Sequence, residues 1–246
     1  MTMPFCEGAN DSGLAGRVLY RDAMMLILNK PAGMPVHAGP SGEITLEHGL
    51  DSLRFGLPTR PGLAHRLDRD TSGCLVLGRH RRALRRLGQL FIARRVEKTY
   101  WAVVQGEPDD AVGTIDLPLA KVSLHKSRWQ MKVDTTVGQT AITDYRVVAR
   151  RGGLTWLALH PRTGRTHQIR VHCAALGCPV LGDAVYGSGG REPLHLHARS
   201  IAVPLYPRRP PITASAPVPP HLEDRLRQLG YQEAVATDDV LYTPRS

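Results

Sequence analysis

The sequence contains few cysteines, and none of them form a paired motif. The four cysteines, Cys6, Cys74, Cys173 and Cys178, are irregularly spaced among 246 residues, and no CxxC pair occurs. Disulfide frameworks and the common zinc sites both need regularly spaced cysteines. We therefore expect reduced thiols that serve mainly as small hydrophobic residues, and no metal site.

Long apolar runs are also lacking. No segment approaches the roughly 20 apolar residues of a membrane-spanning helix. The first residues, MTMPFCEGANDSG, lack the basic start and apolar stretch of a signal peptide. A phosphate-binding loop ending in Gly-Lys is absent as well. These absences predict a cytoplasmic protein with no membrane partner.

Positive charge is what the sequence has in excess. Lysine and arginine number 32 against 22 acidic residues, which gives a formal net charge of +10. Such an excess favours a polyanionic partner, with nucleic acid as the leading candidate. A basic surface that is merely solvated is the alternative, and charge alone does not decide between them.

Short apolar runs separated by Gly and Pro dominate the middle of the chain. Strand patterns cover 17–33 (ending at Pro31), 73–79, 98–106 and 140–164, the last with a hairpin at Gly152-Gly153; helical patterns cover 81–95 and 165–177. The basic stretch 120–132 is expected to be a loop. Because strands outnumber helices, the sequence predicts an α+β fold with a mixed, largely antiparallel sheet and flanking helices.

The ends of the chain differ in composition from its middle. Residues 1–16 are small and polar and predict a flexible leader. Residues 221–246 predict a short helix, from His221 to Leu229, followed by a tail. We expect a single domain over 17–220, although the length alone also permits two small ones.

Two carboxylates stand among arginines in the stretch AHRLDRDTSGCLVLGR, residues 64–79. Asp68 and Asp70 form a DxD pattern, as in some phosphotransferases, but that chemistry needs an apolar strand leading into the first Asp. Here Pro61-Gly62 begins the preceding stretch, and the apolar run comes afterwards. The acids are therefore expected on a turn that enters a strand. A reactive loop and a surface turn with local ion pairs both remain open.

A second basic stretch, HPRTGRTHQIRVH, covers residues 160–172. It gathers Arg162, Arg165 and Arg170 around Gly164, and Thr166 is suited to cap the helix expected there. Guanidinium groups at a helix N-terminus predict an anion site. A solvated basic helix start is the alternative.

Together with HRLDRDTSG (65–73), KTYWAVVQG (98–106) and RTGRTHQIRVH (162–172), three further segments occur in a family-specific order: LILNKPAGMPVH (26–37), LGDAVYG (181–187) and LHLHARSIAVPLY (194–206). The chain from about residue 17 to 220 resembles the RluA-type pseudouridine synthases. The resemblance implies isomerisation of uridine to pseudouridine in ribosomal or transfer RNA stem-loops, by a monomer that needs no cofactor or metal. Several relatives carry an S4-like RNA-binding module, for which the sixteen leading residues are too short.

The resemblance also implies roles for individual residues. Asp68 matches the carboxylate that acts on the sugar as nucleophile or base. A carboxylate enclosed with a base loses hydration, which favours its neutral form, so a cation must hold it ionised. Arg170 matches that cation and is expected to pair with Asp68, with Arg165 as the competing choice. Tyr100 matches the tyrosine that stacks on the base.

The remaining site residues are expected to hold RNA. A uridine in folded RNA must leave its stack before it can react, and Arg66 resembles the residue suggested to fill the gap. His65, Arg69, Thr71 and Arg165 complete the expected RNA-binding set, whereas Asp70 is expected to tie the turn. A catalytically silent RNA-binding or RNA-remodelling protein on the same scaffold is the competing hypothesis. It would predict a replaced Asp68, and Asp68 is present.

Overall fold

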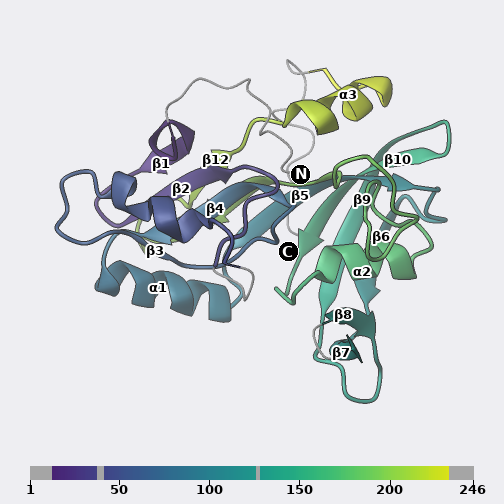
Figure 1. Cartoon of the computed structure of the whole chain (residues 1–246), viewed down its shortest axis with the longest axis horizontal. Coiled ribbons are helices and arrows are strands. Elements are labelled where there is room, and N and C mark those ends of the chain that lie inside the picture. Colours follow the sequence, from purple (N-terminus) through teal and green to yellow (C-terminus); the bar gives the residue numbers. More distant parts are fainter. Residues whose placement is uncertain (1–12, 38–41, 126–127, 233–246) are drawn as a thin grey trace.

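One long mixed sheet forms the frame of the molecule (Figure 1). The structure is a computed structural model that describes residues 13–37, 42–125 and 128–232. Within these residues, ten strands form a sheet in the order β1-β2-β4-β11-β5-β10-β9-β6, with β12 beside β11 and β3 beside β4. Every pairing is antiparallel except that of β4 with β11.

The element bounds are as follows. The strands are β1 (Val18–Arg21), β2 (Met25–Lys30), β3 (Gly62–Leu63), β4 (Ser72–Gly78), β5 (Glu97–Gln105), β6 (Val112–Asp116), β7 (Leu119–His125), β8 (Arg128–Val133), β9 (Ile142–Arg151), β10 (Leu154–Pro161), β11 (Leu196–Val203) and β12 (Ile212–Ser215). The α-helices are α1 (Arg81–Ile92), α2 (Gln168–Ala175) and α3 (Pro220–Gln228), and the 3-10 helices are η1 (Ala15–Arg17) and η2 (Leu46–Leu53).

The predicted α+β class with a largely antiparallel sheet is confirmed. The strands expected at 73–79, 98–106 and 140–164 are β4, β5 and the β9–β10 hairpin. The stretch 17–33 contains two antiparallel strands rather than one. Asp22 causes the reversal, because its Oδ1 accepts hydrogen bonds from the amides of Met24 and Met25 at 2.7 and 2.8 Å.

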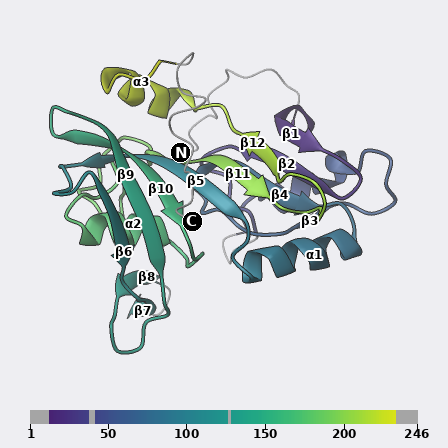
Figure 2. The same cartoon turned by 180° about the vertical axis from the view of Figure 1, so that it is seen from behind.

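The stretch 120–132, expected to be a loop, is instead part of a two-stranded antiparallel hairpin, β7 with β8. Figure 2 shows this hairpin projecting beyond the end of the long sheet. Its apolar residues are only partly covered, since Leu119 and Met131 are buried whereas Leu124 and Trp129 are exposed. Much of the predicted leader and tail lies outside the described residues, and the domain boundaries stay predictions.

Apolar side chains cover both faces of the central strands, which fixes the register that positions the site. On β2, Met25 and Ile27 pack in one cluster with Leu87 of α1, whereas Leu26 and Leu28 pack in another cluster with η2. Because successive strand residues point to opposite faces, this alternation requires a layer on each side. A slip of one residue would exchange the two sets, so the loop that leads into β4 has one permitted position.

The parallel pairing of β4 with β11 depends on a glycine. Gly73 pairs with Ala198 and has a φ of +109°. A Cβ at this position would lie 2.2 Å from the carbonyl oxygen of Ala198. No side chain fits there without moving the backbone, so Gly73 sets how closely the two strands approach.

We expect Gly73→Ala to lower the free energy of unfolding by at least about 2 kcal/mol, because it adds both backbone strain and a steric clash. Gly88→Ala is the matched control. Gly88 lies inside α1, and a Cβ there meets no atom within 4 Å, so the change should stabilise the protein by about 0.5–1 kcal/mol. Urea unfolding of both variants measures the contrast, and similar effects would contradict this account.

Candidate active site

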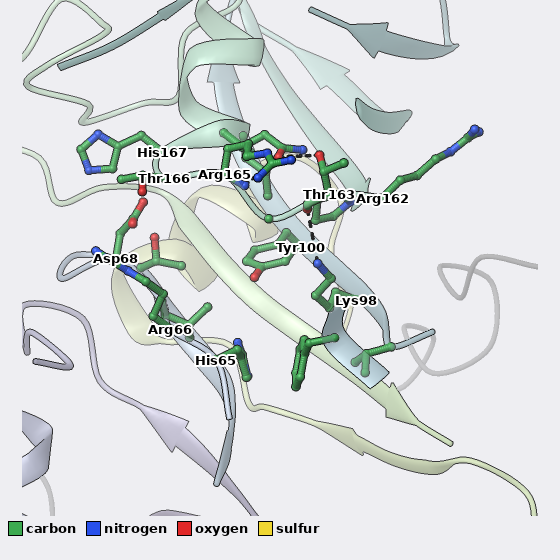
Figure 3. Close-up of a pocket in the computed structure, with 18 of the residues that line it drawn as sticks. His65, Arg66, Asp68, Lys98, Tyr100, Arg162, Thr163, Arg165, Thr166 and His167 are labelled. Carbon is green, nitrogen blue, oxygen red and sulfur yellow. Dashed lines mark hydrogen bonds between the residues drawn. The ribbon is translucent and has the colours of Figure 1, made fainter. Parts of the chain in front are cut away.

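A cavity of about 560 Å³ opens between three parts of the chain that are distant in sequence (Figure 3). Its walls come from the loop 65–71 before β4, from residues 91–100 at the end of α1 and start of β5, and from residues 161–170 between β10 and α2. Its volume is in the range of ligand-binding pockets. Each segment includes residues of one motif that the sequence singled out, 65–73, 98–106 or 162–172.

The loop that carries Asp68 is held from below by a buried lysine. Lys30 is fully buried at the end of β2, and its Nζ donates hydrogen bonds of 2.8 Å to the carbonyl oxygens of Pro31, Met34 and Arg69. Burial lowers the pKa of Lys30 to about 8, although the charges of Asp70 and Asp68 oppose the shift. Lys30 therefore fixes the backbone beside Asp68 and supplies positive charge under it.

Tyr100 and its neighbour Trp101 point to opposite faces of β5, as strand geometry requires. Trp101 packs with Leu222 and Leu226 of α3, whereas Tyr100 lines the cavity. Burial raises the pKa of the Tyr100 phenol, and the charge of Asp68 raises it further. The phenol is therefore protonated at neutral pH and available as a hydrogen-bond donor.

Lys98 is a cavity residue that the sequence analysis missed. Its Nζ donates to the carbonyl oxygen of Thr163 at 3.4 Å, and burial lowers its pKa to about 8. Lys98 stands two residues before Tyr100 on the same strand, so period-2 alternation would have placed it in the cavity with Tyr100.

The base of the site is formed by a buried ion pair. Arg170 in α2 makes a bidentate contact with Asp183, with Nε–Oδ2 and Nη2–Oδ1 distances of 2.7 Å. The two side chains are only 8% and 0% exposed. Asp183 also accepts hydrogen bonds from the backbone amides of Val185 and Tyr186 at 2.9 and 3.0 Å. These bonds fix the carboxylate independently of Arg170.

The expected ion pair between Arg170 and Asp68 is wrong in this structure. Arg170 turns to Asp183, and the competing candidate, Arg165, donates its Nε to the carbonyl oxygen of Thr140 at 3.1 Å. Within the described residues Asp68 has no ion pair. Burial lowers the pKa of Arg170, but the hydrogen bonds and charge of Asp183, with the charge of Asp68, outweigh burial and raise it. Asp68 therefore interacts with the guanidinium through space.

His167 links the cavity to the projecting hairpin. Its ring stacks on Trp129 of β8 with centroids 5.5 Å apart, and its Nδ1 lies 2.8 Å from the Tyr186 hydroxyl. That hydroxyl accepts the amide of Met131 in β8 at 3.0 Å. Burial lowers the pKa of His167, and the charge of Asp68 opposes that shift. A neutral imidazole next to Asp68 is the result.

Thr166 does not cap α2 as expected. The N-cap position is His167, which has a left-handed φ of +53° and no side-chain capping bond. Gln168 ties the preceding turn instead, because its Oε1 accepts the amide of Arg165 at 3.0 Å. Thr166 faces the cavity, and Figure 3 shows Asp68 pointing toward it.

The expected RNA-binding residues of the first motif fall into different environments. Arg66 is exposed and lines the cavity, and Thr71 lines it as a buried residue. Among the described residues the Thr71 hydroxyl has no hydrogen-bond partner. Arg69 is exposed and pairs with its sequence neighbour Asp70 at 3.0 Å, and the expected role of Asp70 in tying the turn stays a prediction.

His65 is committed to the cavity wall. Its Nε2 accepts the amide of Val76 at 2.9 Å, and its ring stacks on Phe91 at 4.6 Å. Burial lowers the pKa of His65 to about 3, with a smaller effect from the charge of Lys98. A neutral ring with these contacts supports the wall rather than offering positive charge to a phosphate.

The arrangement suits chemistry on a neutral organic ring. A carboxylate, a phenol and a guanidinium line one cavity whose walls combine apolar and polar side chains, and these groups can act as nucleophile or base, as proton carrier and as charge support.

We expect Asp183→Asn to lower the free energy of unfolding by about 3 kcal/mol near neutral pH, because it leaves the buried Arg170 charge uncompensated. Asp144→Asn is the matched control. Asp144 also makes a bidentate pair, but its partner Arg162 is 55% exposed, so about 1 kcal/mol or less should be lost. Urea unfolding provides the measurement, and equal losses would contradict the special role of the buried pair.

The same comparison has a pH dependence with a definite sign. Burial raises the pKa of Asp183, but hydrogen bonds and the charge of Arg170 outweigh it, so the pKa lies below the model-compound value of 3.8. The stabilisation is therefore complete above the unfolded-state pKa and is lost as pH falls through the lowered one. The difference between wild type and Asp183→Asn should narrow below about pH 4.

Three comparisons relate the chain to known proteins. The family model described as RNA pseudouridylate synthase matches residues 24–175. An RNA pseudouridine synthase of Zymomonas mobilis is 45% identical over 215 residues, covering 86% of this chain and 97% of the relative. Ribosomal large subunit pseudouridine synthase D of Borreliella burgdorferi is 37% identical, over 69% of this chain and 54% of the relative.

A solved structure agrees with these sequence matches. The structure of human RNA pseudouridylate synthase domain containing 4 superposes with a TM-score of 0.74 at 26% identity, covering 88% of this chain and 94% of that one. The family model covers the three cavity segments and both cavity residues Asp68 and Tyr100. The chain belongs to the RNA pseudouridylate synthase family, the isomerases that convert uridine in RNA to pseudouridine.

Proposed function

We propose that this chain isomerises uridines in structured RNA, ribosomal or transfer RNA, with Asp68 as the reacting carboxylate. The observation that carries the proposal is the meeting of Asp68, Tyr100 and Arg170 in one cavity from three separate segments. The match to a ribosomal large subunit synthase supports ribosomal RNA as a substrate. The charge of +10 supports binding of a polyanion.

The reaction exchanges one bond to the ribose for another. The bond between uracil N1 and the anomeric carbon breaks, the base turns, and carbon five bonds to the same sugar carbon. Asp68 either adds to the anomeric carbon or removes the neighbouring ribose proton, and it leaves unchanged at the end. Carbon five gives up its hydrogen and N1 gains one, so no atom is gained or lost overall.

The surrounding residues have distinct roles in this scheme. Tyr100 lies against the base and takes part in the movement of the carbon-five proton as a relay, because its protonated phenol can accept that proton only as it gives up its own. Arg170 acts on Asp68 by its field, held in place by Asp183. Arg66, exposed at the cavity, occupies the space that the everted nucleotide leaves in the RNA stack.

Thr71 is a binding residue in this scheme. Thr71 lines the cavity, and its buried hydroxyl has no hydrogen-bond partner within the described part of the chain, which makes it a candidate to bind a substrate oxygen or N–H. Exposed Arg69 and half-buried Arg165 are assigned to flanking phosphates, because guanidinium groups bind phosphate well.

The cellular setting is part of the proposal. Across the described residues, no helix has the length and apolar character to cross a membrane. Relatives include bacterial proteins and a mitochondrial one from Xenopus tropicalis that is 33% identical. We assign the chain to the cytoplasm as a monomer, and gel filtration together with cell fractionation tests both assignments.

We expect wild-type protein to release tritium from RNA labelled at carbon five of uridine, since that hydrogen leaves as the new bond forms. Asp68→Asn should lower the release at least about 10²-fold, because an amide can neither attack nor accept the proton. RNA binding, measured by filter retention, should persist. Asp70→Asn is the matched control and should keep its activity, because Asp70 pairs with Arg69 on the surface of the turn.

Labelled ribosomal RNA and labelled transfer RNA are both supplied in this assay. Mapping of the modified positions then identifies the target. Tritium release by neither the wild type nor Asp70→Asn, with RNA binding intact, would favour the silent RNA-binding protein. Full activity of Asp68→Asn would exclude Asp68 as the reacting group.

A further inference from the structure

Six arginines on α1 and directly after it share one property: the described part of the protein offers them no partner. Five are exposed and Arg86 is half-buried. Among the described residues no guanidinium of the six makes a hydrogen bond, ion pair or ring contact, although their backbone groups take part in the hydrogen bonds of α1 and of the turn after it. The set, here named the α1 arginine face, consists of Arg81, Arg82, Arg85, Arg86, Arg94 and Arg95.

Several arginines elsewhere on the surface pair with acids. Arg54, Arg69, Arg162, Arg225 and Arg227 each pair with an Asp or Glu. Helix α1, in contrast, has no acidic residue at all, RRALRRLGQLFI. Within the described residues the positive charge of α1 is therefore not balanced by acids, as it is at these five arginines.

This arrangement is unfavourable for the isolated helix. Arg81 and Arg82 occupy the first turn, where the helix dipole disfavours cations. Arg81 with Arg85 and Arg82 with Arg86 are like-charge pairs four residues apart, which destabilise a helix. A bound polyanion would remove both penalties, so the arrangement favours a ligand of that charge.

The helix also leads to the cavity. Phe91, Ile92 and Arg94 at its C-terminal end line the cavity, and Ile92 is 84% exposed. Figure 1 shows α1 running along the sheet toward the centre of the molecule, where β5 begins. Twelve residues make a helix of about 18 Å, which matches about five nucleotides of a stacked strand at 3.4 Å each.

One arginine near this set belongs to the fold instead. Arg79, directly before α1, is buried, and its guanidinium donates to the carbonyl oxygens of Asp22, Arg54 and Phe55. The structure thus distinguishes Arg79, which supports the fold, from its six neighbours with unpartnered guanidinium groups. The sequence alone does not make this distinction.

We propose that the α1 arginine face binds the phosphates of the RNA strand that flanks the everted uridine. The inference rests on the proposed function for its substrate. An RNA strand is favoured over an acidic protein because the face is continuous with the cavity that takes the nucleotide, and guanidinium groups bind phosphate in a bidentate manner.

The test compares two double variants of equal charge. Arg81→Gln/Arg85→Gln removes two charges from the α1 arginine face, and glutamine retains helix propensity. Arg191→Gln/Arg208→Gln removes two exposed charges that do not line the cavity. The affinity of each for bulk transfer RNA and ribosomal RNA is measured by filter binding over a series of salt concentrations.

The α1 variant should bind roughly tenfold more weakly, and the slope of log affinity against log salt should become shallower by about 1.4, or 0.7 for each lost phosphate contact. In the tritium assay the loss should appear in KM rather than kcat. The control pair should keep the wild-type slope. Circular dichroism of the α1 variant should show intact helix, since two repulsive pairs are removed.

A wild-type salt slope for the α1 variant would overturn the inference, and so would equal losses for the two pairs, which would indicate net charge alone. The outcome is separable from the proposed function. If the wild type releases no tritium, the proposed function is contradicted, but the salt slopes of RNA binding still test the α1 arginine face. If tritium is released and the salt slope of the α1 variant is unchanged, only the inference about the α1 arginine face is contradicted.

Discussion

The site depends first on the buried contact between Arg170 and Asp183. Its two 2.7 Å bonds join α2 to the turn after Val180, and Tyr186 in that turn lies 5.1 Å from the Arg170 guanidinium. Removing two charges from water is expensive, and the bidentate geometry and the two backbone amides on Asp183 offset that cost. The pair thereby fixes a permanent positive charge at the base of the cavity.

The other parts of the site are arranged around that charge. Lys30 holds the loop of Asp68 by a hydrogen bond to the carbonyl oxygen of Arg69. Gly73 sets how closely the strand that follows, β4, approaches β11. Tyr186 connects the buried pair to His167 and to the β7–β8 hairpin. The Asp68 carboxylate thus has a neighbouring cation, Arg170, whose position is fixed by its own partner. Such a fixed charge is electrostatic preorganisation.

The sequence predicted the parts of the fold that depend on local pattern. The apolar runs of β2, β4 and β5 and the Gly152-Gly153 hairpin are local, and so are the apolar stripes of the two main helices. The parallel pairing of β4 with β11 joins residues about 125 positions apart, so no local signal reports it. The β7–β8 hairpin was missed because its basic residues resemble those of a loop.

For the candidate site, the sequence predicted which segments come together better than it predicted the contacts between their side chains. The motifs containing Asp68, Tyr100 and Arg170 do meet in one cavity. The direct pair of Arg170 with Asp68 was wrong because a second acid, Asp183, lies deeper and is already held by backbone amides. Which of two acids pairs with an arginine depends on the burial of each acid. Spacing along the chain does not reveal that burial.

The most direct measurement is a crystal structure of the Asp68→Asn protein with an RNA stem-loop that the wild type modifies. It should show the target uridine outside its stack, with the uracil ring against Tyr100, the anomeric carbon next to residue 68, and Arg170 still on Asp183. A target base that remains stacked in the RNA, or that binds away from the cavity, would contradict the account.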